Sequence, residues 1–453
     1  KSKMKKSFEE NNVKTAKYYE ISNECELNEA LEKIHGLLHF GSRPGLDRIL
    51  KLLDLIGNPQ DKCKFVHVAG TNGKGSVCQM ISSVLTEAKY KTGLFISPFI
   101  TDFRERIQIN GEMIPKQKLA DIVEYIYPFV EQMAENDEII TEFEFVNAIA
   151  FYYYYIEKCD IVVLETGMGG LLDCTNTIPA PLCSVITPID LDHTAVLGDT
   201  IEKITYQKCG IIKKDSNTVI GEQTHKEIEK QIVRDCVEKH NMYHFAEDCK
   251  VKVKLSTLDG TIVKYKGKEF TLHLVGLHQI SNLKTALTAI EVLNNEHYFG
   301  ITPTDIEYGI AKANNPARFE VLSKEPTVIL DGAHNPNGME AFAKSVDEYT
   351  TAPRVLIMGM LKDKDITHSL NFIDGKFDTV FTLTVDNPRT ISNIELAKMC
   401  EGKFNNAIPC DTPEEAIDKA LALADKINGT VMICGSLYLA GEIRPILMNK
   451  FKK

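Results

Sequence analysis

The sequence KFVHVAGTNGKGSVCQMISSVLTEA occupies residues 64–88 and determines the fold that the rest of the chain must fit. Its first apolar run predicts a buried strand, and the amphipathic segment 75–89 predicts a helix. Between them, the glycines of Gly70–Ser76 (GTNGKGS) let backbone N–H groups turn toward phosphate oxygens at the positive end of that helix. Lys74 can then reach the outer phosphates, and Ser76 can bind Mg²⁺. This segment therefore predicts a nucleotide-phosphate site on an α/β fold.

The loop differs from the common phosphate loop G-x-x-x-x-G-K-[ST] in its spacing. Fewer residues precede Lys74, and Gly75 separates it from Ser76. An ordinary glycine-rich turn between a strand and a helix is the structural alternative. The strand before the loop and the helix after it favour nucleotide binding.

Short β-rich runs and longer helical patterns continue to alternate beyond this segment. Further buried strands are predicted at 92–96, 160–165, 184–187 and 217–221, and helices at 116–134 and 144–158. This alternation predicts a parallel sheet with helices on both faces. Residues 250–275 instead alternate apolar and polar side chains around the turn pair Asp259-Gly260, which predicts two or three antiparallel strands.

A second α/β series follows residue 300. It consists of predicted strands at 327–331, 354–358, 378–385 and 429–434 and predicted helices at 336–348, 391–402 and 412–425. Turn residues between Phe299 and Pro316 mark the boundary between the two series. We therefore expect an α/β protein of two domains. Residues 1–298 would form a P-loop-type, mostly parallel sheet flanked by helices with a small antiparallel addition, and residues 299–453 a Rossmann-like α/β domain.

Composition narrows the class of protein. The chain has 453 residues, 43% of them apolar, and a formal net charge of -11, which argues against a long nucleic acid as partner. Its twelve cysteines form no C-x-x-C pair, and reduced thiols in a cytoplasmic protein are the simplest interpretation. The N-terminal KSKMKKSFEENNVK is basic and polar, so we expect no signal peptide there. No run of about 18 apolar residues occurs, so we expect no membrane span.

Polar side chains follow several of the predicted strands. Ser97, Glu165 and His193 stand at strand ends of the first series, and Asp331 ends a strand of the second. Because the carboxyl ends of parallel strands face the ligand crevice, these side chains could meet around one nucleotide. Glu165 and Ser97 suit Mg²⁺, whereas His193 implies a second ion with a less strict preference for oxygen. Taken singly, each residue also fits a structural role in a turn, a cap or a loop.

Two cations remain ambiguous when they are considered alone. Lys208 fits a solvated surface lysine. Arg318 fits a linker residue, although its place just after the boundary would also let it reach a nucleotide bound by the first domain.

These residues belong to a longer set of motifs that resembles the folylpolyglutamate synthase and dihydrofolate synthase family, within the Mur-type amide ligases. In chain order the motifs are Gly70–Ser76, Ser97-Pro98, Thr141–Glu144, Glu165–Asn176, Asp192-His193, Lys208–Ile212, His278-Gln279 with Asn282, Arg318–Glu320, Asp331–Pro336 and Lys362–Asp365. The resemblance covers most of the chain, from about Gly41 to Gly441.

The resemblance implies a role for each motif. Residues that would hold the ATP phosphates and adenosine are Gly70, Thr71, Asn72, Gly73, Lys74, Gly75, Ser76, Asn282, Arg318 and Asp331. Ligands of two Mg²⁺ ions would be Ser76, Ser97, Glu165 and His193. The pterin-bearing substrate would contact Thr141, Phe143, Glu144, Asp173 and Cys174. Lys74, Lys208 and His334 would act in catalysis, and Lys208 looks like the family's carbamylated lysine.

Two positions depart from the family pattern. Phe99 stands where the family usually has histidine, and Cys174 where it often has alanine or serine. Both departures fall on the expected folate side rather than among the expected ATP or metal ligands.

The resemblance implies an ATP-dependent ligase that adds L-glutamate to the γ-carboxylate of a folate or folylpolyglutamate through an acyl phosphate, releasing ADP and phosphate. It leaves dihydropteroate open as a further substrate, and we expect a monomer. Three alternatives remain. A cell-wall Mur ligase is disfavoured by the TxFE and DGAHNP segments, and a GTP-dependent switch by the lack of an N-K-x-D motif. A nucleotide-binding module without catalysis is disfavoured by the number of residues typical of catalysis.

Overall fold

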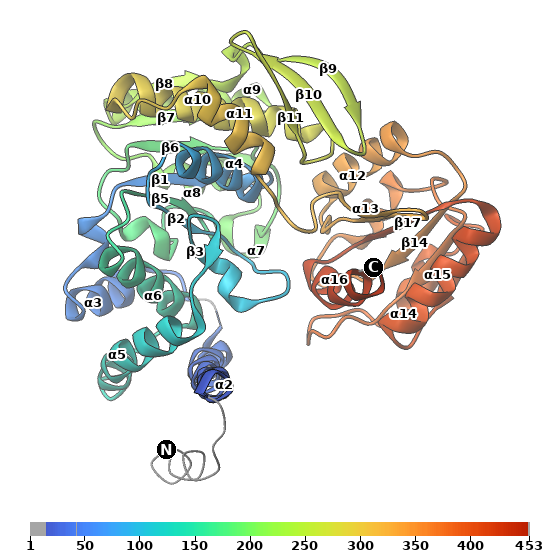
Figure 1. The fold of residues 1–453 in the computed structure, drawn as a ribbon, viewed down its shortest axis with the longest axis horizontal. Helices are drawn as coiled ribbons and strands as arrows, with labels where there is room; N and C mark the ends of the chain where they lie inside the picture. Colours follow the sequence, from blue (N-terminus) through green and yellow to red (C-terminus); the bar gives the residue numbers. More distant parts are fainter. Residues whose placement is uncertain (1–14, 42, 452–453) are drawn as a thin grey trace.

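The computed structural model describes residues 15–41 and 43–451, with side chains from Glu24 onward. The basic N-terminal segment, for which no signal peptide is expected, lies outside the described residues. Within the described ranges, no helix is long and apolar enough to cross a membrane. Figure 1 shows two α/β lobes that are joined where the chain passes from α11 (Pro303–Lys312) to the second sheet.

The first lobe is built on an eight-stranded sheet in the order β4-β3-β2-β5-β1-β6-β7-β8. Its strands are β1 (Phe65–Ala69), β2 (Thr92–Phe95), β3 (Ile107–Ile109), β4 (Glu112–Met113), β5 (Ile161–Glu165), β6 (Cys183–Ile186), β7 (Asn217–Ile220) and β8 (Met242–Phe245). The strands from β2 to β8 in this order pair in parallel, which confirms the predicted parallel sheet. The antiparallel edge β3-β4 and the outer strand β8 were not predicted, because they are short and β4 and half of β8 are exposed.

Helices cover both faces of this sheet (Figure 1). On one face lie α2 (Thr15–His35), α3 (Asp47–Leu55), α5 (Lys116–Ala134), α6 (Glu142–Ile156), α8 (Ile201–Lys208) and α9 (Lys226–Glu238), and on the other α4 (Lys74–Glu87), α10 (His278–His297) and α11. Alternation along β1 decides the sides, because Phe65 packs with the first group and Val66 and Val68 with the second. All residues of β1 are buried, as expected for a central parallel strand covered on both faces.

The predicted antiparallel addition is confirmed as a separate three-stranded sheet. It consists of β9 (Lys252–Thr257), β10 (Gly260–Tyr265) and β11 (Lys268–Leu272). Its apolar face, including Val263 and Phe270, packs into the same core as α10 and α11.

The second lobe contains a six-stranded sheet in the order β12-β13-β17-β14-β15-β16. Its strands are β12 (Glu320–Lys324), β13 (Thr327–Leu330), β14 (Arg354–Met358), β15 (Thr379–Thr382), β16 (Asn406–Pro409) and β17 (Thr430–Cys434). Only β12 runs antiparallel to its neighbour. Helices α12 (Pro336–Tyr349), α13 (Ile366–Phe372) and α14 (Asn393–Cys400) cover one face, and α15 (Pro413–Ile427) and α16 (Leu437–Phe451) the other.

The position of α11 bears on the domain division. This helix packs against α4 and β11 of the first lobe, with Ile306 and Ile310 in the core beside Val84. The chain then crosses to the second sheet through residues 313–319. We therefore propose a domain boundary within 313–319, which assigns α11 to the first domain rather than to the second, where the division at residue 299 had put it.

Candidate functional site

The loop between β1 and α4 wraps the amino end of that helix. Gly73 has a φ of 86° and precedes Lys74, the first residue of α4. A Cβ at Gly73 would lie 2.4 Å from Oδ1 of Asn282, so only glycine allows α10 to approach the loop this closely. The Lys74 ammonium lies back on the loop and donates to the carbonyl oxygens of Gly70 (3.2 Å) and Thr71 (3.1 Å). The loop thus brings a cation and free helix-end N–H groups to one place, as anion binding requires.

A cavity of about 240 Å³ lies in front of this loop and is lined by both domains. Predicted site residues on its wall are Thr71, Asn72, Gly73, Lys74, Gly75, Ser76, Ser97, Glu165, His193, Asn282, Arg318, Asp331 and His334. The structure therefore brings together residues that lie far apart in the sequence. Gly70, the first residue of the loop, and Lys208 do not line this cavity.

Glu165 ends β5 and is the buried carboxylate nearest the loop. Only 5% of its surface is exposed, and its Oε2 accepts a hydrogen bond from the Ser97 backbone N–H at 3.2 Å. Burial raises its pKa, and the Lys74 charge opposes that rise. Among the described residues it has no ion-pair partner within 4 Å, and no three histidine, cysteine or acidic side chains gather into a complete metal site. A divalent cation at this point would need additional oxygen ligands from substrate, water or a modified residue.

Lys208 ends α8 and is buried directly beneath the phosphate loop. Only 4% of its surface is exposed, and its Nζ donates to the Gly70 carbonyl oxygen at 2.7 Å. Burial, reinforced by the Lys74 charge, lowers its pKa to about 7. This position excludes a solvated surface lysine. His193 directly precedes α7 (Thr194–Leu197). Burial lowers the pKa of its imidazole too, which favours the neutral ring with a free lone pair.

The second domain contributes the segment that follows β13. Burial raises the pKa of Asp331 to about 6, and its carboxylate accepts hydrogen bonds from the N–H groups of Phe319 and Ala333, each at 2.7 Å. The His334 Nδ1 lies 2.7 Å from the Gly332 carbonyl oxygen, and burial lowers the pKa of the ring to about 4. Because a carbonyl oxygen only accepts, Nδ1 carries the proton and Nε2 keeps its lone pair.

Arg318 connects the carboxylates of the two domains electrostatically. Its positive charge opposes the rise in pKa of both Glu165 and Asp331. The Arg318 Nη1 lies close to the backbone of Gly332, where an added Cβ would be only 2.9 Å away from it. No hydrogen bond or ion pair within the described residues engages the guanidinium, so it is available to an anion in the cavity.

A second cavity of about 450 Å³ adjoins the first. Of the residues expected to hold a pterin-bearing substrate, Thr141, Phe143, Asp173 and Cys174 line it. Its other lining residues were given no role from the sequence. Glu142, Met168 and Leu172 lie within the quoted motifs, whereas Leu38, Arg43, Val196, Gln207 and Tyr438 lie outside them. Ser97, Gly167 and His193 line both cavities, so the two spaces meet at these residues.

Glu144 does not line either cavity. Its buried carboxylate closes a capping box with Thr141 at the start of α6 and pairs with the partly exposed Arg48 at 3.0 Å. Its neighbour Glu142 faces the second cavity and pairs with Arg106 at 3.0 Å. The structure thus gives Glu144 a structural role, in contrast to the substrate contact expected from the motif.

Phe99 also lies away from both cavity walls. Its ring packs on the Arg106 guanidinium at 5.1 Å and on the Phe103 ring at 5.9 Å. The departure from histidine at this position therefore changes the support behind Glu142 rather than the lining of the cavity.

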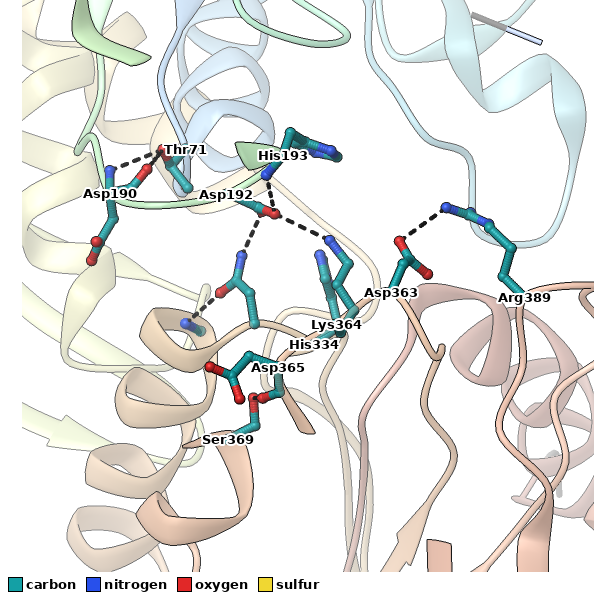
Figure 2. A network of polar contacts seen from close by, with 12 residues as sticks. Thr71, Asp190, Asp192, His193, His334, Asp363, Lys364, Asp365, Ser369 and Arg389 are labelled. Carbon is teal, nitrogen blue, oxygen red and sulfur yellow. Dashed lines mark hydrogen bonds and ion pairs between the residues drawn. The ribbon is translucent and has the colours of Figure 1, made fainter. Parts of the chain in front are cut away.

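Contacts between the domains include residues to which no role was given from the sequence. Figure 2 shows Asp192 facing the second domain, where Lys364 (3.2 Å) and the amide of Asn335 (2.8 Å) donate to its carboxylate. All three lie in motifs quoted above, but only the fold shows that they pair across the cleft.

Both lobes of the chain match models of known protein families. Residues 68–290 match the Mur ligase middle domain, and residues 317–437 match the Mur ligase glutamate ligase domain. The dihydrofolate synthase/folylpolyglutamate synthase of Bacillus subtilis is 34% identical over 421 residues, covering 91% of this chain and 96% of the relative.

Two solved structures extend the comparison. The Mycobacterium tuberculosis folylpolyglutamate synthase complexed with ADP and AMPPCP superposes with a TM-score of 0.84 at 30% identity, covering 93% of this chain and 99% of the other. Escherichia coli FolC in complex with DHPP and ADP superposes with a TM-score of 0.81 at 29% identity, covering 94% and 98%.

Proposed function

This chain belongs to the folylpolyglutamate synthase and dihydrofolate synthase family of Mur-type ligases, and from that premise we propose how its two cavities perform the ligation. It is an ATP-dependent ligase that joins glutamate to a folate substrate. We assign ATP to the cavity in front of the phosphate loop and the folate to the adjoining cavity. The observation that carries this assignment is their junction at Ser97, Gly167 and His193. There the terminal phosphate of one ligand can meet the carboxylate of the other.

The first step activates the carboxylate. A folate γ-carboxylate oxygen attacks the γ-phosphorus of ATP, the bond from that phosphorus to the β-bridging oxygen breaks, and ADP leaves with its electron pair. Lys74 and Arg318, which line the cavity from the two domains, offset the negative charge of the transferring group. The product is an acyl phosphate, and enclosure between the domains protects it from water.

The second step forms the amide. The amine of the incoming glutamate attacks the acyl carbon, and the carbon–oxygen bond to phosphate breaks. An amine can attack only after its ammonium has lost a proton. His334 is neutral and its Nε2 lone pair is free, so it can accept that proton from the second-domain side of the cavity.

The residues around Glu165 fit Mg²⁺. Four side chains on the cavity wall offer donor atoms for metal ions: the buried carboxylate of Glu165, the hydroxyls of Ser76 and Ser97, and the imidazole of His193. We assign these four residues to two ions. When bound, the ions supply positive charge for the phosphate oxygens. Among these four residues only Glu165 carries a carboxylate, so a second anionic ligand would help to balance the charge of two ions.

We assign that second anion to a carbamate on Lys208. Carbamylation by CO₂ requires a neutral amine, and a lysine with a pKa of about 7 is partly neutral at physiological pH. The carbamate nitrogen keeps one N–H, so the hydrogen bond to the Gly70 carbonyl oxygen can persist. The carbamate would supply a negative charge and two oxygen donors beneath the phosphate loop.

The metal assignment makes a prediction for Glu165 and His193. We expect Glu165→Gln and His193→Ala each to lower kcat at least about tenfold and to raise the Mg²⁺ concentration needed for half-maximal rate. Affinity for ADP without metal should change little, because the loop contacts remain. Mg²⁺ titrations of turnover and nucleotide titrations by calorimetry measure the two quantities. Unchanged Mg²⁺ dependence in both variants would remove these residues from the metal site.

Arg318 provides a second prediction. Its charge acts on carboxylates of both domains, so Arg318→Ala should raise the KM for ATP and lower kcat together, by about tenfold or more in kcat/KM. Arg389→Ala is a matched control, because Arg389 is exposed and pairs with Asp363 outside both cavities. If neither constant changes in Arg318→Ala, this residue is only part of the linker.

The assay that tests the proposed function measures ADP release with glutamate and either a reduced folate or dihydropteroate. ADP release that requires glutamate and a reduced folate supports the proposal. Additional release with dihydropteroate would add dihydrofolate synthase activity. ADP release that depends on neither the reduced folate nor dihydropteroate would contradict the proposed function.

A further inference from the structure

Asn337 lies in the first turn of α12 and bridges two loops of the first domain. Its side-chain Nδ2 donates to Oδ2 of Asp190 at 2.8 Å, and its Oδ1 accepts from Nδ2 of Asn72 at 2.6 Å. Asn72 belongs to the phosphate loop, and Asp190 to the loop between β6 and α7. One amide of the second domain therefore contacts both loops at once.

The two loops that Asn337 bridges are already tied to each other. The Thr71 hydroxyl donates to the Asp190 carbonyl oxygen at 2.9 Å and accepts from the Asp190 N–H at 3.0 Å (Figure 2). The Thr71 N–H donates to the Pro188 carbonyl oxygen at 2.8 Å. A shift of the phosphate loop would therefore move Asp190 with it, and Asn337 would lose both partners together.

Two further contacts hold the second domain at the same place. Asn335 and Lys364 both donate to Asp192, which lies two residues beyond Asp190 and beside His193. The Lys364–Asp192 pair is largely buried, so water does little to weaken it. Three side chains of the second domain, Asn335, Asn337 and Lys364, thus hold it against the loop that contains Asp190 and Asp192.

We propose that Asn337 is a positioning residue that makes the phosphate loop adopt its working geometry only when the two domains are closed. This inference rests on the proposed function, since closure has to bring His334 and Asp331 to the nucleotide held by the loop. Asn337 acts through Asn72 and Asp190. The role requires an amide, because the position must donate toward one partner and accept from the other.

This requirement gives a selective test. An aspartate at 337 would still accept from Asn72, but it would place a carboxylate against that of Asp190. Asp190→Asn would remove the repulsion, because the new amide could donate to the aspartate. Asn337→Ala would lose both contacts, and Asp190→Asn could not restore them.

The experiment measures kcat and the dissociation constant of ADP for Asn337→Asp, Asn337→Ala, Asp190→Asn and the two double variants. We expect Asn337→Asp and Asn337→Ala to lower kcat about tenfold or more, with the ADP dissociation constant changed less than about threefold. Asp190→Asn should restore most of the rate to Asn337→Asp and none to Asn337→Ala. Asn449→Asp, which adds the same charge on the exposed surface of α16, should match the wild type.

Small-angle scattering of the nucleotide-free proteins gives a readout that needs no turnover. Asn337→Asp should have a larger radius of gyration than the wild type, and the Asn337→Asp/Asp190→Asn pair should return to the wild-type value. Wild-type kcat in Asn337→Asp, or equal rescue of both Asn337 variants, would overturn the positioning role. If the wild type made no ligated product but the variants still showed the expected changes in radius of gyration, the proposed function would be overturned. The role of Asn337 in joining the two domains would stand.

Discussion

Replacing Lys74 by alanine is expected to lower kcat by about 10²–10³-fold while the protein stays folded. The ammonium lies on the phosphate loop and faces the cavity, where it contributes charge rather than packing. That charge matters most when the γ-phosphoryl group carries its greatest negative charge between donor and acceptor. The KM for ATP should therefore rise less than kcat falls.

Steady-state ADP release and thermal unfolding of the same preparations measure these effects. Lys312→Ala is the matched control, because it removes an exposed lysine that pairs with Glu87 on the surface of the same domain. Near wild-type turnover in a well-folded Lys74→Ala protein would rule out the role assigned to this lysine.

Replacing Lys208 by alanine is expected to reduce activity at least about a hundredfold, through loss of the carbamate. A small added carboxylate such as acetate should restore part of the rate by occupying the space of the missing group. Lys203→Ala, an exposed position on the same helix that pairs with Asp199, should behave as the wild type. If the loss of activity came only from an unfilled cavity, acetate would not restore the rate. Absence of rescue by acetate, together with an unmodified Lys208 amine in active wild-type protein, would refute the carbamate.

The pKa of Lys208 adds a pH dependence with a defined sign. With a pKa of about 7, the amine is increasingly protonated as the pH falls below 7, and the protonated form does not react with CO₂. Activity after equilibration should therefore fall below pH 7, and added bicarbonate should offset part of that fall. His334, with a pKa of about 4, stays neutral through this range, so its protonation should not contribute to the fall in activity just below pH 7.

The sequence predicted those parts of the fold that depend on local pattern. Residues 64–88 specify β1, the phosphate loop and α4 by apolar runs and glycines, and the structure has these elements within one or two residues of the prediction. The sequence did not predict the edge strands β4 and β8, because their exposed residues lack the apolar pattern of central strands. The division at residue 299 and the boundary proposed within 313–319 differ in their placement of helix α11, because turn residues flank this helix at both ends and the sequence does not show what it packs against.

The candidate site shows a similar division between local motif and tertiary contact. Strand-end positions correctly indicated that Ser97, Glu165 and Asp331 could lie around one cavity. The motif could not show that the Glu144 carboxylate is already engaged in an ion pair with Arg48 and in a helix capping box. Nor could it show that Asn337 contacts Asn72, since these residues are far apart in the chain and pair only across the boundary between the domains.

Activation of the folate carboxylate as an acyl phosphate, before glutamate attacks, determines where the two oxygens of that carboxylate go. The most direct measurement uses a folate substrate with ¹⁸O in its γ-carboxylate, together with ATP and glutamate, and determines the label in the released phosphate by mass spectrometry. Formation of the acyl phosphate transfers a carboxylate oxygen to phosphorus, so each turnover should deliver one labelled oxygen to phosphate, and the remaining one should stay in the new amide. Unlabelled phosphate alongside a fully formed glutamyl product would contradict this activation.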